Sequence, residues 1–191
     1  MAIKKTTYQK GKEFESQFAD FMLKDLGYDK VRDRAFLTSR INPRGSEVDI
    51  VGVIEDRRGH LFLSLSLIML GISFLFLLYS LLFEDYEMIY ISIPLIIGGL
   101  IYPLIARNMF NKYTWVECKA WSKNVPLKEV RDCYNRFKEY NASKDKRHAC
   151  HKMIFVAKSG FVPNVKDYAK DNDIELYVLG EKSFELLEYW N

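Results

Sequence analysis

Two long apolar runs interrupt an otherwise polar chain. Residues 61–83 and 88–106 are each long enough, at helical rise, to cross a hydrocarbon core about 30 Å thick. Only the acidic link 84–87 joins them, so the pattern predicts an antiparallel helical hairpin that spans a membrane twice. Basic residues precede the first run and follow the second. Because cytoplasmic loops are enriched in Lys and Arg, we expect a cell-membrane protein with both termini in the cytoplasm.

The residues on either side of the hairpin have the periodicities of an α/β domain. In chain order we predict a helix at 8–26, strands at 30–41 and 47–54, the hairpin, a strand around 114–121, a helix at 127–141, a strand at 153–157, a helix at 163–172, a strand at 174–179 and a closing helix at 181–189. If the two strands that flank the hairpin pair antiparallel, their adjoining ends lie close together. We therefore expect one domain, 1–57 with 108–191, split by the insertion 61–106.

Most of the charged residues lie outside the two apolar runs. The whole chain carries 28 Lys and Arg against 25 Asp and Glu, but three of the acidic residues and none of the basic ones fall within 61–106. The remainder therefore has a formal charge of +6, against +3 for the whole chain. This excess favours an anionic partner, either nucleic acid or lipid headgroups, without choosing between them.

The cysteines indicate a reducing compartment. Cys118, Cys133 and Cys150 are odd in number and lack a CxxC spacing, which favours free thiols over a disulfide framework. His148 and His151 flank Cys150, but no second ligand pair has the spacing of a zinc site. We interpret that cluster as a loop that leads into a strand.

The stretch TWVECKAW carries the candidate chemistry. Glu117 and Lys119 are two residues apart, so on a strand they point to one face, while Cys118 points to the other. We interpret the neighbouring Trp115 and Trp121 as core residues rather than as surfaces for base stacking. Charged groups in such a strand are costly without a ligand or partner, which indicates a functional role for them.

Asp49 lies in the middle of the strand that we expect beside this stretch. Asp49 and Glu117 would then place two carboxylates next to the Lys119 ammonium at one sheet edge. Two hard oxygen ligands suit Mg²⁺ that keeps several waters, as it does when its substrate is a phosphate. Such a set fits phosphodiester hydrolysis, and Glu15 on the first helix would add a carboxylate if that helix packs across the same edge.

Four segments in this order resemble the PD-(D/E)xK nuclease superfamily, specifically its Mrr-like restriction endonuclease branch. They are GKEFE (11–15), GSEVDIVG (45–52), VECKAW (116–121) and the tail from Met153 to Leu187. The resemblance implies a restriction-endonuclease-like fold of class α/β, a mixed sheet flanked by helices and here interrupted by the transmembrane hairpin. It also implies a metal-dependent DNA endonuclease.

Site residues follow from the same resemblance. It implies that Asp49 and Glu117 hold Mg²⁺, with Mn²⁺ as a substitute, that the Cys118 carbonyl completes the shell, that Lys119 assists the nucleophile, and that Glu15 matches the helical glutamate of that branch. The sequence does not separate DNA from RNA as substrate. Membrane lipid is a further expected partner, and a homodimer would suit double-strand cleavage.

Two functions remain open at this stage. The first is a membrane-anchored, Mg²⁺-dependent DNA endonuclease, in defence against foreign DNA or in DNA processing. The second is a non-catalytic membrane adaptor that keeps the nuclease-like fold to bind nucleic acid or protein. Stabilisation by a divalent metal ion would separate them, because only converging carboxylates bind the ion.

Overall fold

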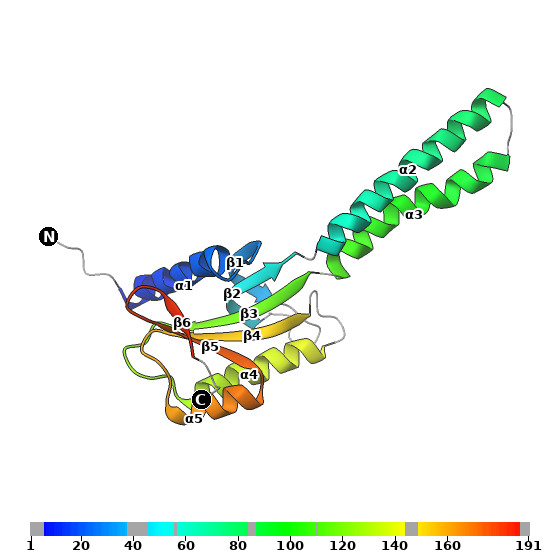
Figure 1. Ribbon diagram of the computed structural model, residues 1–191. Coiled ribbons are helices and arrows are strands. Elements are labelled where there is room, and N and C mark those ends of the chain that lie inside the picture. Colours follow the sequence, from blue (N-terminus) through cyan, green and yellow to red (C-terminus); the bar gives the residue numbers. More distant parts are fainter. Residues whose placement is uncertain are drawn as a thin grey trace. The chain divides into compact units, whose positions relative to one another are not determined.

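The computed structural model describes residues 6–37, 46–55, 57–83, 87–109, 111–143 and 149–187. The chain divides into two compact units (Figure 1). One unit is Met1–Ile54 together with Lys112–Asn191, which we call the sheet domain. The other is Glu55–Asn111, which we call the helical hairpin.

Among the described residues, six strands form one sheet whose spatial order is the order of the sequence. The strands are β1 (Lys30–Leu37), β2 (Ser46–Ile54), β3 (Lys112–Lys119), β4 (Cys150–Ala157), β5 (Ile174–Leu179) and β6 (Phe184–Leu186). β1, β2 and β3 run antiparallel to one another, β3, β4 and β5 run parallel, and β6 returns antiparallel to β5. The sheet is therefore mixed, as expected.

Helix α1, Thr7–Lys24, covers one face of the sheet. It starts at a capping box in which Thr6 and Gln9 exchange hydrogen bonds between side chain and backbone. Apolar side chains four residues apart then form one buried face. These are Phe14, Phe18 and Met22, joined by Ala19, and they pack against Ile50, Val116, Cys118 and Phe184 from the sheet.

Gly52 allows this helix to approach β2 closely. A Cβ atom at Gly52 would lie 2.7 Å from the Tyr28 ring and in collision with the end of Met22. The Tyr28 hydroxyl donates a buried 2.9 Å hydrogen bond to the Thr114 hydroxyl on β3, which holds the ring in place. The absence of a side chain at Gly52 is therefore needed for packing.

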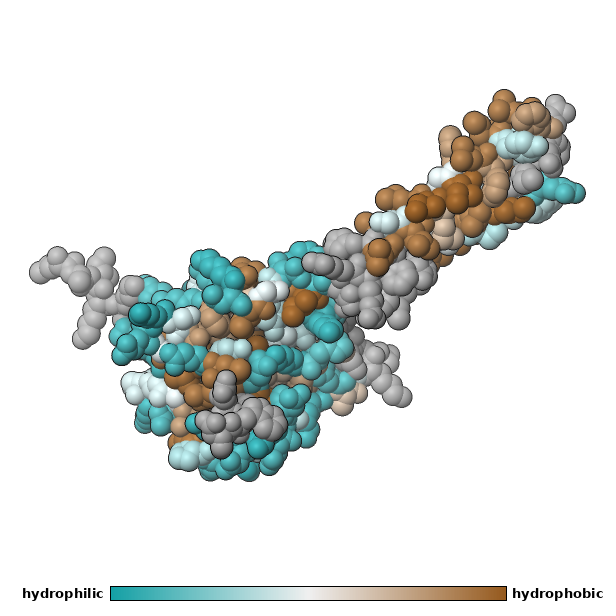
Figure 2. All heavy atoms as spheres, in the orientation of Figure 1, coloured by the Kyte–Doolittle hydropathy of each residue, from teal (hydrophilic) through white to brown (hydrophobic). Residues whose placement is uncertain are grey.

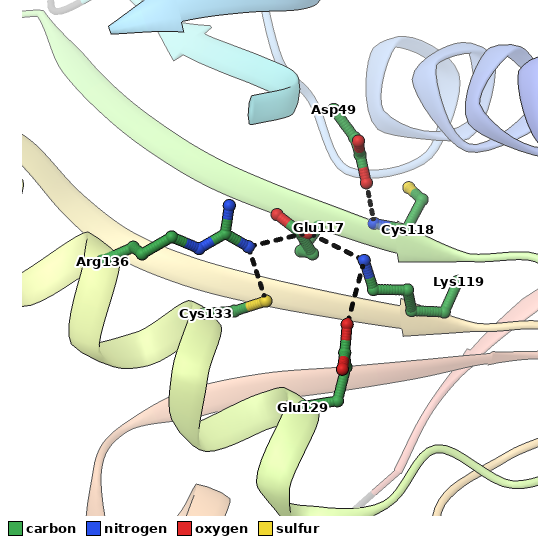
Figure 3. Close-up of polar contacts among 7 residues, drawn as sticks. All are labelled: Asp49, Glu117, Cys118, Lys119, Glu129, Cys133 and Arg136. Carbon is green, nitrogen blue, oxygen red and sulfur yellow. Dashed lines mark hydrogen bonds and ion pairs between the residues drawn. The ribbon is translucent and has the colours of Figure 1, made fainter. Parts of the chain in front are cut away.

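Helices α4, Leu127–Ala142, and α5, Pro163–Asp171, cover the other face (Figure 1). Each connects two parallel strands, as crossover helices do. Their buried side chains pack around Trp115, whose exposed fraction is 0%. The two helical layers enclose the sheet and place the start of α4 beside the end of β3 (Figure 3).

The helical hairpin replaces a β-turn. Ile54 at the end of β2 pairs with Lys112 at the start of β3, and the antiparallel ladder continues to Ile50 and Val116. The two points where the chain leaves and re-enters the sheet domain are thus neighbours. β2 and β3 therefore pair in continuous register on either side of the insertion.

The predicted closing helix at 181–189 is wrong. Residues 184–186 form the short strand β6, which pairs with β5, and residues 188–191 lie outside the described part. A tight turn makes the reversal, since the backbone N–H of Gly180 donates to the carbonyl of Ser183 at 2.8 Å. Phe184 then packs against the rings of Phe14 and Phe18. Burial of one aromatic side chain against α1 therefore overrides the local helical pattern.

The helical hairpin consists of α2, Arg57–Phe83, and α3, Glu87–Met109. Four of its serine side chains are buried: Ser66, Ser73, Ser80 and Ser92 are at most 3% exposed. Gly99 is also buried, with a Leu70 atom 2.8 Å from where its Cβ would be. Leucine, isoleucine and phenylalanine side chains are exposed along both helices, and Figure 2 shows this apolar surface.

Among the described residues, one helix is long and apolar enough to cross a membrane, at Leu63–Phe83. A shorter apolar helical segment, Ile89–Ile101, follows it. The predicted second span at 88–106 is therefore not confirmed, and the two-span topology stays a prediction.

Candidate active site

The candidate site is built on the last residues of β3, which is buried from Thr114 to Cys118. Alternation along the strand sends Val116 and Cys118 into the cluster under α1. Glu117 points to the opposite face, where it meets side chains of α4 (Figure 3). Only 3% of Glu117 is exposed, so its carboxylate is a buried charge that requires partners.

Asp49 reaches this stretch from the neighbouring strand β2. The ladder between β2 and β3 ends at Ile50 and Val116, next to Asp49 in the sequence. Beyond that point the Asp49 side chain replaces a backbone acceptor, because its Oδ2 accepts a 2.7 Å hydrogen bond from the N–H of Cys118 (Figure 3). The structure therefore brings Asp49 beside the Glu117–Lys119 stretch, as predicted.

Burial and a like charge make the Asp49 carboxylate hard to ionise. Burial raises the pKa of Asp49, and the Glu117 carboxylate raises it further, so that it reaches about 6. The hydrogen bond from Cys118 and the charge of Lys119 act in the opposite direction. Two carboxylates are thus held close together against their mutual repulsion, which is the electrostatic setting of a cation site.

The two carboxylate oxygens of Glu117 have different surroundings. Oε1 accepts from Lys119 Nζ at 2.9 Å and from Arg136 Nη2 at 3.2 Å. Within the described part of the chain, Oε2 is buried and has no hydrogen-bond partner. A buried carboxylate oxygen without a donor is costly, which makes it the natural place for a cation.

Lys119 supplies a positively charged ammonium group to the site. Its Nζ lies 2.9 Å from Glu117 Oε1 and 3.6 Å from Glu129 Oε1 of α4 (Figure 3). Burial lowers the pKa of Lys119, but the Glu117 charge and hydrogen bond raise it by more, so the net shift is upward. Lys119 is therefore a fixed cation. It shares a strand face with Glu117, as the spacing predicts.

Glu15 faces the same region from α1, but it has its own partner. Its Oε2 accepts from Arg34 Nε at 3.3 Å, and Arg34 also donates to the Tyr8 hydroxyl at 3.0 Å. Arg34 has a φ of 47°, an unusual value for a residue other than glycine, and it lies in β1. The Glu15 charge is close enough to raise the pKa of Asp49 slightly. Glu15 therefore borders the site without an unpaired carboxylate.

Three further side chains of the site come from α4 and were missed by sequence reasoning. Arg136 Nη2 bonds both Glu117 and, at 3.0 Å, Cys133 Sγ, while Glu129 bonds Lys119. Glu129, Cys133 and Arg136 are spaced at four and three residues, so they share one stripe of the helix. That spacing is the only signal in the sequence, and it does not differ from the spacing of ordinary surface charges.

Trp115 and Trp121 differ in environment. Trp115 is fully buried, as expected, but Trp121 is 40% exposed, so its interpretation as a core residue is wrong. Trp121 lies past the end of β3, where the chain leaves the sheet, and the Lys119 ammonium sits 5.9 Å from its ring centroid. The structure thus leaves an aromatic surface beside the candidate site.

The residues present fit a divalent ion with few protein ligands. In the residues described, no group of three His, Cys, Asp or Glu side chains is placed to hold a metal. Asp49 and Glu117 supply two carboxylates, and Glu117 Oε2 has no hydrogen-bond partner among these residues. Two such ligands leave most coordination positions to water and substrate. Mg²⁺ is commonly bound in this way. The Cys118 side chain is buried under α1, so only its backbone could take part.

Comparison with known proteins supports a nuclease. A restriction endonuclease family model of the Mrr catalytic type matches residues 104–182, which include β3, α4, β4, α5 and β5. This match supports the Mrr-like branch of the PD-(D/E)xK nucleases and a nuclease-type function on DNA, and the mixed sheet flanked by helices fits a restriction-endonuclease-like fold. Asp49 and Glu15 lie outside the matched residues, and the tertiary structure brings them to the matched part.

Among solved structures, the chain is similar to the crystal structure of a protein of unknown function, AF1548. The TM-score is 0.48 at 15% sequence identity, and the similarity covers 90% of this chain and 61% of that one. The chain therefore spans less than two thirds of the length of this relative. No curated protein matches the sequence.

Proposed function

We propose that this protein is a membrane-anchored, Mg²⁺-dependent DNA endonuclease whose site is formed by Asp49, Glu117 and Lys119. The observation that carries the proposal is the buried Glu117 carboxylate. One of its oxygens contacts two cations, and the other has no partner among the residues that the structure describes. A second carboxylate, Asp49, is held beside it although its ionisation is disfavoured there. Such an arrangement is stabilised when a divalent cation binds.

Each proposed residue has a distinct task. Asp49 and Glu117 would hold the ion, which supplies charge that polarises a phosphoryl oxygen and stabilises the leaving oxygen. The hydrogen bond from Cys118 orients the Asp49 carboxylate. Lys119 would orient the attacking water and offset the negative charge that develops on the phosphate. Its raised pKa keeps it protonated for this task at neutral pH.

The membrane anchor is supported by the burial pattern of the helical hairpin. Ser66, Ser73, Ser80, Ser92 and Gly99 are buried within the hairpin, while large apolar side chains are exposed. Small residues at helix contacts and apolar residues on the outer surface are typical of membrane helices, because lipid, unlike water, solvates the apolar surface. A hairpin in water would have the reverse pattern.

The catalytic proposal is tested with the full-length protein in detergent. Plasmid DNA is incubated with Mg²⁺, Mn²⁺ or EDTA, beside an RNA substrate and the Asp49→Ala variant. We expect cleavage that needs the metal ion and is lost in the variant. If neither nucleic acid is cleaved and no metal ion binds, the adaptor function replaces the nuclease.

Topology is tested separately with reporter enzymes fused after residue 85 and at the C-terminus. Two spans place the tip of the hairpin and the C-terminus on opposite sides of the membrane, so a reporter that is active only outside the cytoplasm should work at the tip alone. If both fusions report the same side, the two-span topology is wrong.

A further inference from the structure

Arg136 has no place in the function proposed above, yet it makes the most direct contact of α4 with the site. Its Nη2 lies 3.2 Å from Glu117 Oε1 and 3.0 Å from Cys133 Sγ, and its side chain is 42% exposed (Figure 3). The same nitrogen donates both of these hydrogen bonds. One end of the guanidinium thus touches a buried carboxylate, while much of the side chain faces solvent.

The charges of the site suggest why a second cation is present. Asp49, Glu117 and Glu129 contribute three carboxylates, against the two cations Lys119 and Arg136. With all of them ionised, the site carries one net negative charge, and a divalent ion changes this to one net positive charge. A single phosphodiester then neutralises it. Without Arg136, the ion-loaded site would be neutral and would have no charge left to attract the DNA backbone.

Geometry favours a change of partner for Arg136. Glu117 Oε1 accepts from both Lys119 and Arg136, whereas Oε2 has no hydrogen-bond partner in the described part of the chain and could bind a cation. A cation bound at Oε2 partly neutralises the Glu117 carboxylate. The attraction between Glu117 and Arg136 then becomes weaker. The planar guanidinium of arginine can donate two parallel hydrogen bonds to one phosphate group, which a lysine ammonium cannot do.

We propose that Arg136 is a phosphate-binding residue of this site: it neutralises Glu117 when no divalent ion is bound and binds a backbone phosphate of the DNA when the ion and the DNA are present. This inference rests on the proposed nuclease function and names the residue that couples metal binding to DNA binding. It assigns α4 a role in substrate recognition besides its packing against the sheet.

The test uses the full-length protein in detergent and two binding measurements. Calorimetry with Mn²⁺ alone reports the metal site, and anisotropy of a fluorescent DNA duplex in Ca²⁺ reports DNA binding at several salt concentrations. The variants are Arg136→Gln, which removes the charge, and Arg136→Lys, which keeps the charge but not the fork. Arg131→Gln is the matched control, because Arg131 is an exposed arginine of the same helix. Its Cζ lies 5.7 Å from the centroid of the Tyr168 ring rather than beside Glu117.

We expect Arg136→Gln to weaken DNA binding about tenfold and to reduce the slope of log affinity against log salt by about one unit. Its Mn²⁺ affinity should not fall, since a competing cation has been removed from Glu117. Arg136→Lys should restore the salt slope but only part of the affinity. Arg131→Gln should leave both affinities within about twofold of wild type.

Three outcomes would overturn the inference. If Arg136→Gln binds DNA like wild type while wild type binds both ligands, Arg136 does not contact phosphate, and the nuclease proposal is unaffected. If Arg136→Gln lowers Mn²⁺ affinity and DNA affinity alike, Arg136 only supports the fold around Glu117. If wild type binds neither Mn²⁺ nor DNA, the nuclease proposal fails and this inference fails with it.

Discussion

The Asp49 carboxylate accepts a 2.7 Å hydrogen bond from the backbone N–H of Cys118, and this contact joins two strands whose sequences are separated by the entire helical hairpin. It lies at the point where the ladder between β2 and β3 ends. The bond lowers the pKa of Asp49, but burial and the Glu117 charge raise it by more, and the pKa reaches about 6. The fold thus holds two carboxylates together at a cost that a bound cation would offset.

The first prediction concerns the pH dependence of stability without metal. The pKa of Asp49 is higher in the folded protein, about 6, than its ordinary value of 3.8, so the folded state binds more protons between these values. In EDTA, the free energy of unfolding should therefore fall as pH rises through this window and then level off. Asp49→Asn should be more stable than wild type at neutral pH, by up to about 3 kcal/mol.

Chemical denaturation followed by tryptophan fluorescence, at a series of pH values, measures this difference. Near pH 4 the two proteins should have nearly the same stability. A difference between them that does not change with pH would mean that Asp49 is not a titrating, destabilising group. Asp20, an exposed residue of α1, is the matched position for an Asp→Asn control.

The second prediction concerns Glu117 and the metal ion. At a concentration of Mn²⁺ about 100 times its Kd, binding to the folded state alone adds about 2.7 kcal/mol to the free energy of unfolding. Wild type should therefore show a rise in Tm with Mn²⁺. Glu117→Gln should lose most of this rise, because the amide is a weaker ligand and Lys119 and Arg136 lose their charged partner. Glu175→Gln, which removes a carboxylate on β5, should keep the full rise.

The third prediction separates binding from catalysis at Lys119. Lys119→Met keeps much of the length of the side chain but removes the ammonium, so DNA cleavage should fall by about 10²- to 10³-fold. Metal affinity should be retained, because a competing cation leaves Glu117 Oε1. Single-turnover plasmid nicking and Mn²⁺ calorimetry measure the two effects. Lys166→Met, on the exposed side of α5, controls for a general loss of positive charge. Unchanged nicking in Lys119→Met would exclude a catalytic role.

The fourth prediction follows from the pairing of Ile54 with Lys112. Because these residues are cross-strand neighbours, replacing residues 55–111 with Asn-Gly should close β2 and β3 with a two-residue turn. The shortened protein should be soluble without detergent, keep metal-dependent cleavage in solution and no longer associate with membranes. Fractionation and a plasmid assay test this. A shortened chain that aggregates would show that the sheet domain needs the hairpin to fold.

The fifth prediction concerns Gly52. A valine there would meet the Tyr28 ring and the end of Met22, and the ring is held by its hydrogen bond to Thr114. We expect Gly52→Val to destabilise the sheet domain by about 1–3 kcal/mol, the usual cost of overpacking. Gly11→Val is a control for the substitution itself, since among the described residues no atom other than those of the adjacent residues and the local helix backbone lies within 4 Å of a Cβ at Gly11. A Tm for Gly52→Val equal to that of wild type would contradict the packing argument.

The sequence by itself determined the elements and most of the motif. Period-two alternation placed Glu117 and Lys119 on one face, and the long apolar runs marked the insertion, because these features depend only on residues that are close along the chain. Within the described residues, the strands and helices agree with the prediction apart from shifts at their ends and the difference at the C-terminus. Residues 38–41 of the predicted strand 30–41 lie outside the described residues. There, packing of Phe184 onto α1 favours a strand over the predicted helix.

Only the tertiary structure decided which side chains meet. The hydrogen bond from Cys118 to Asp49 depends on where the β2–β3 ladder ends, and the contact of Arg136 with Glu117 depends on how α4 packs against the sheet. Likewise, the pairing of Glu15 with Arg34 requires α1 to lie near β1. These contacts join residues far apart in the sequence, so their geometry is set by strand register and helix packing, which local patterns of polarity do not encode.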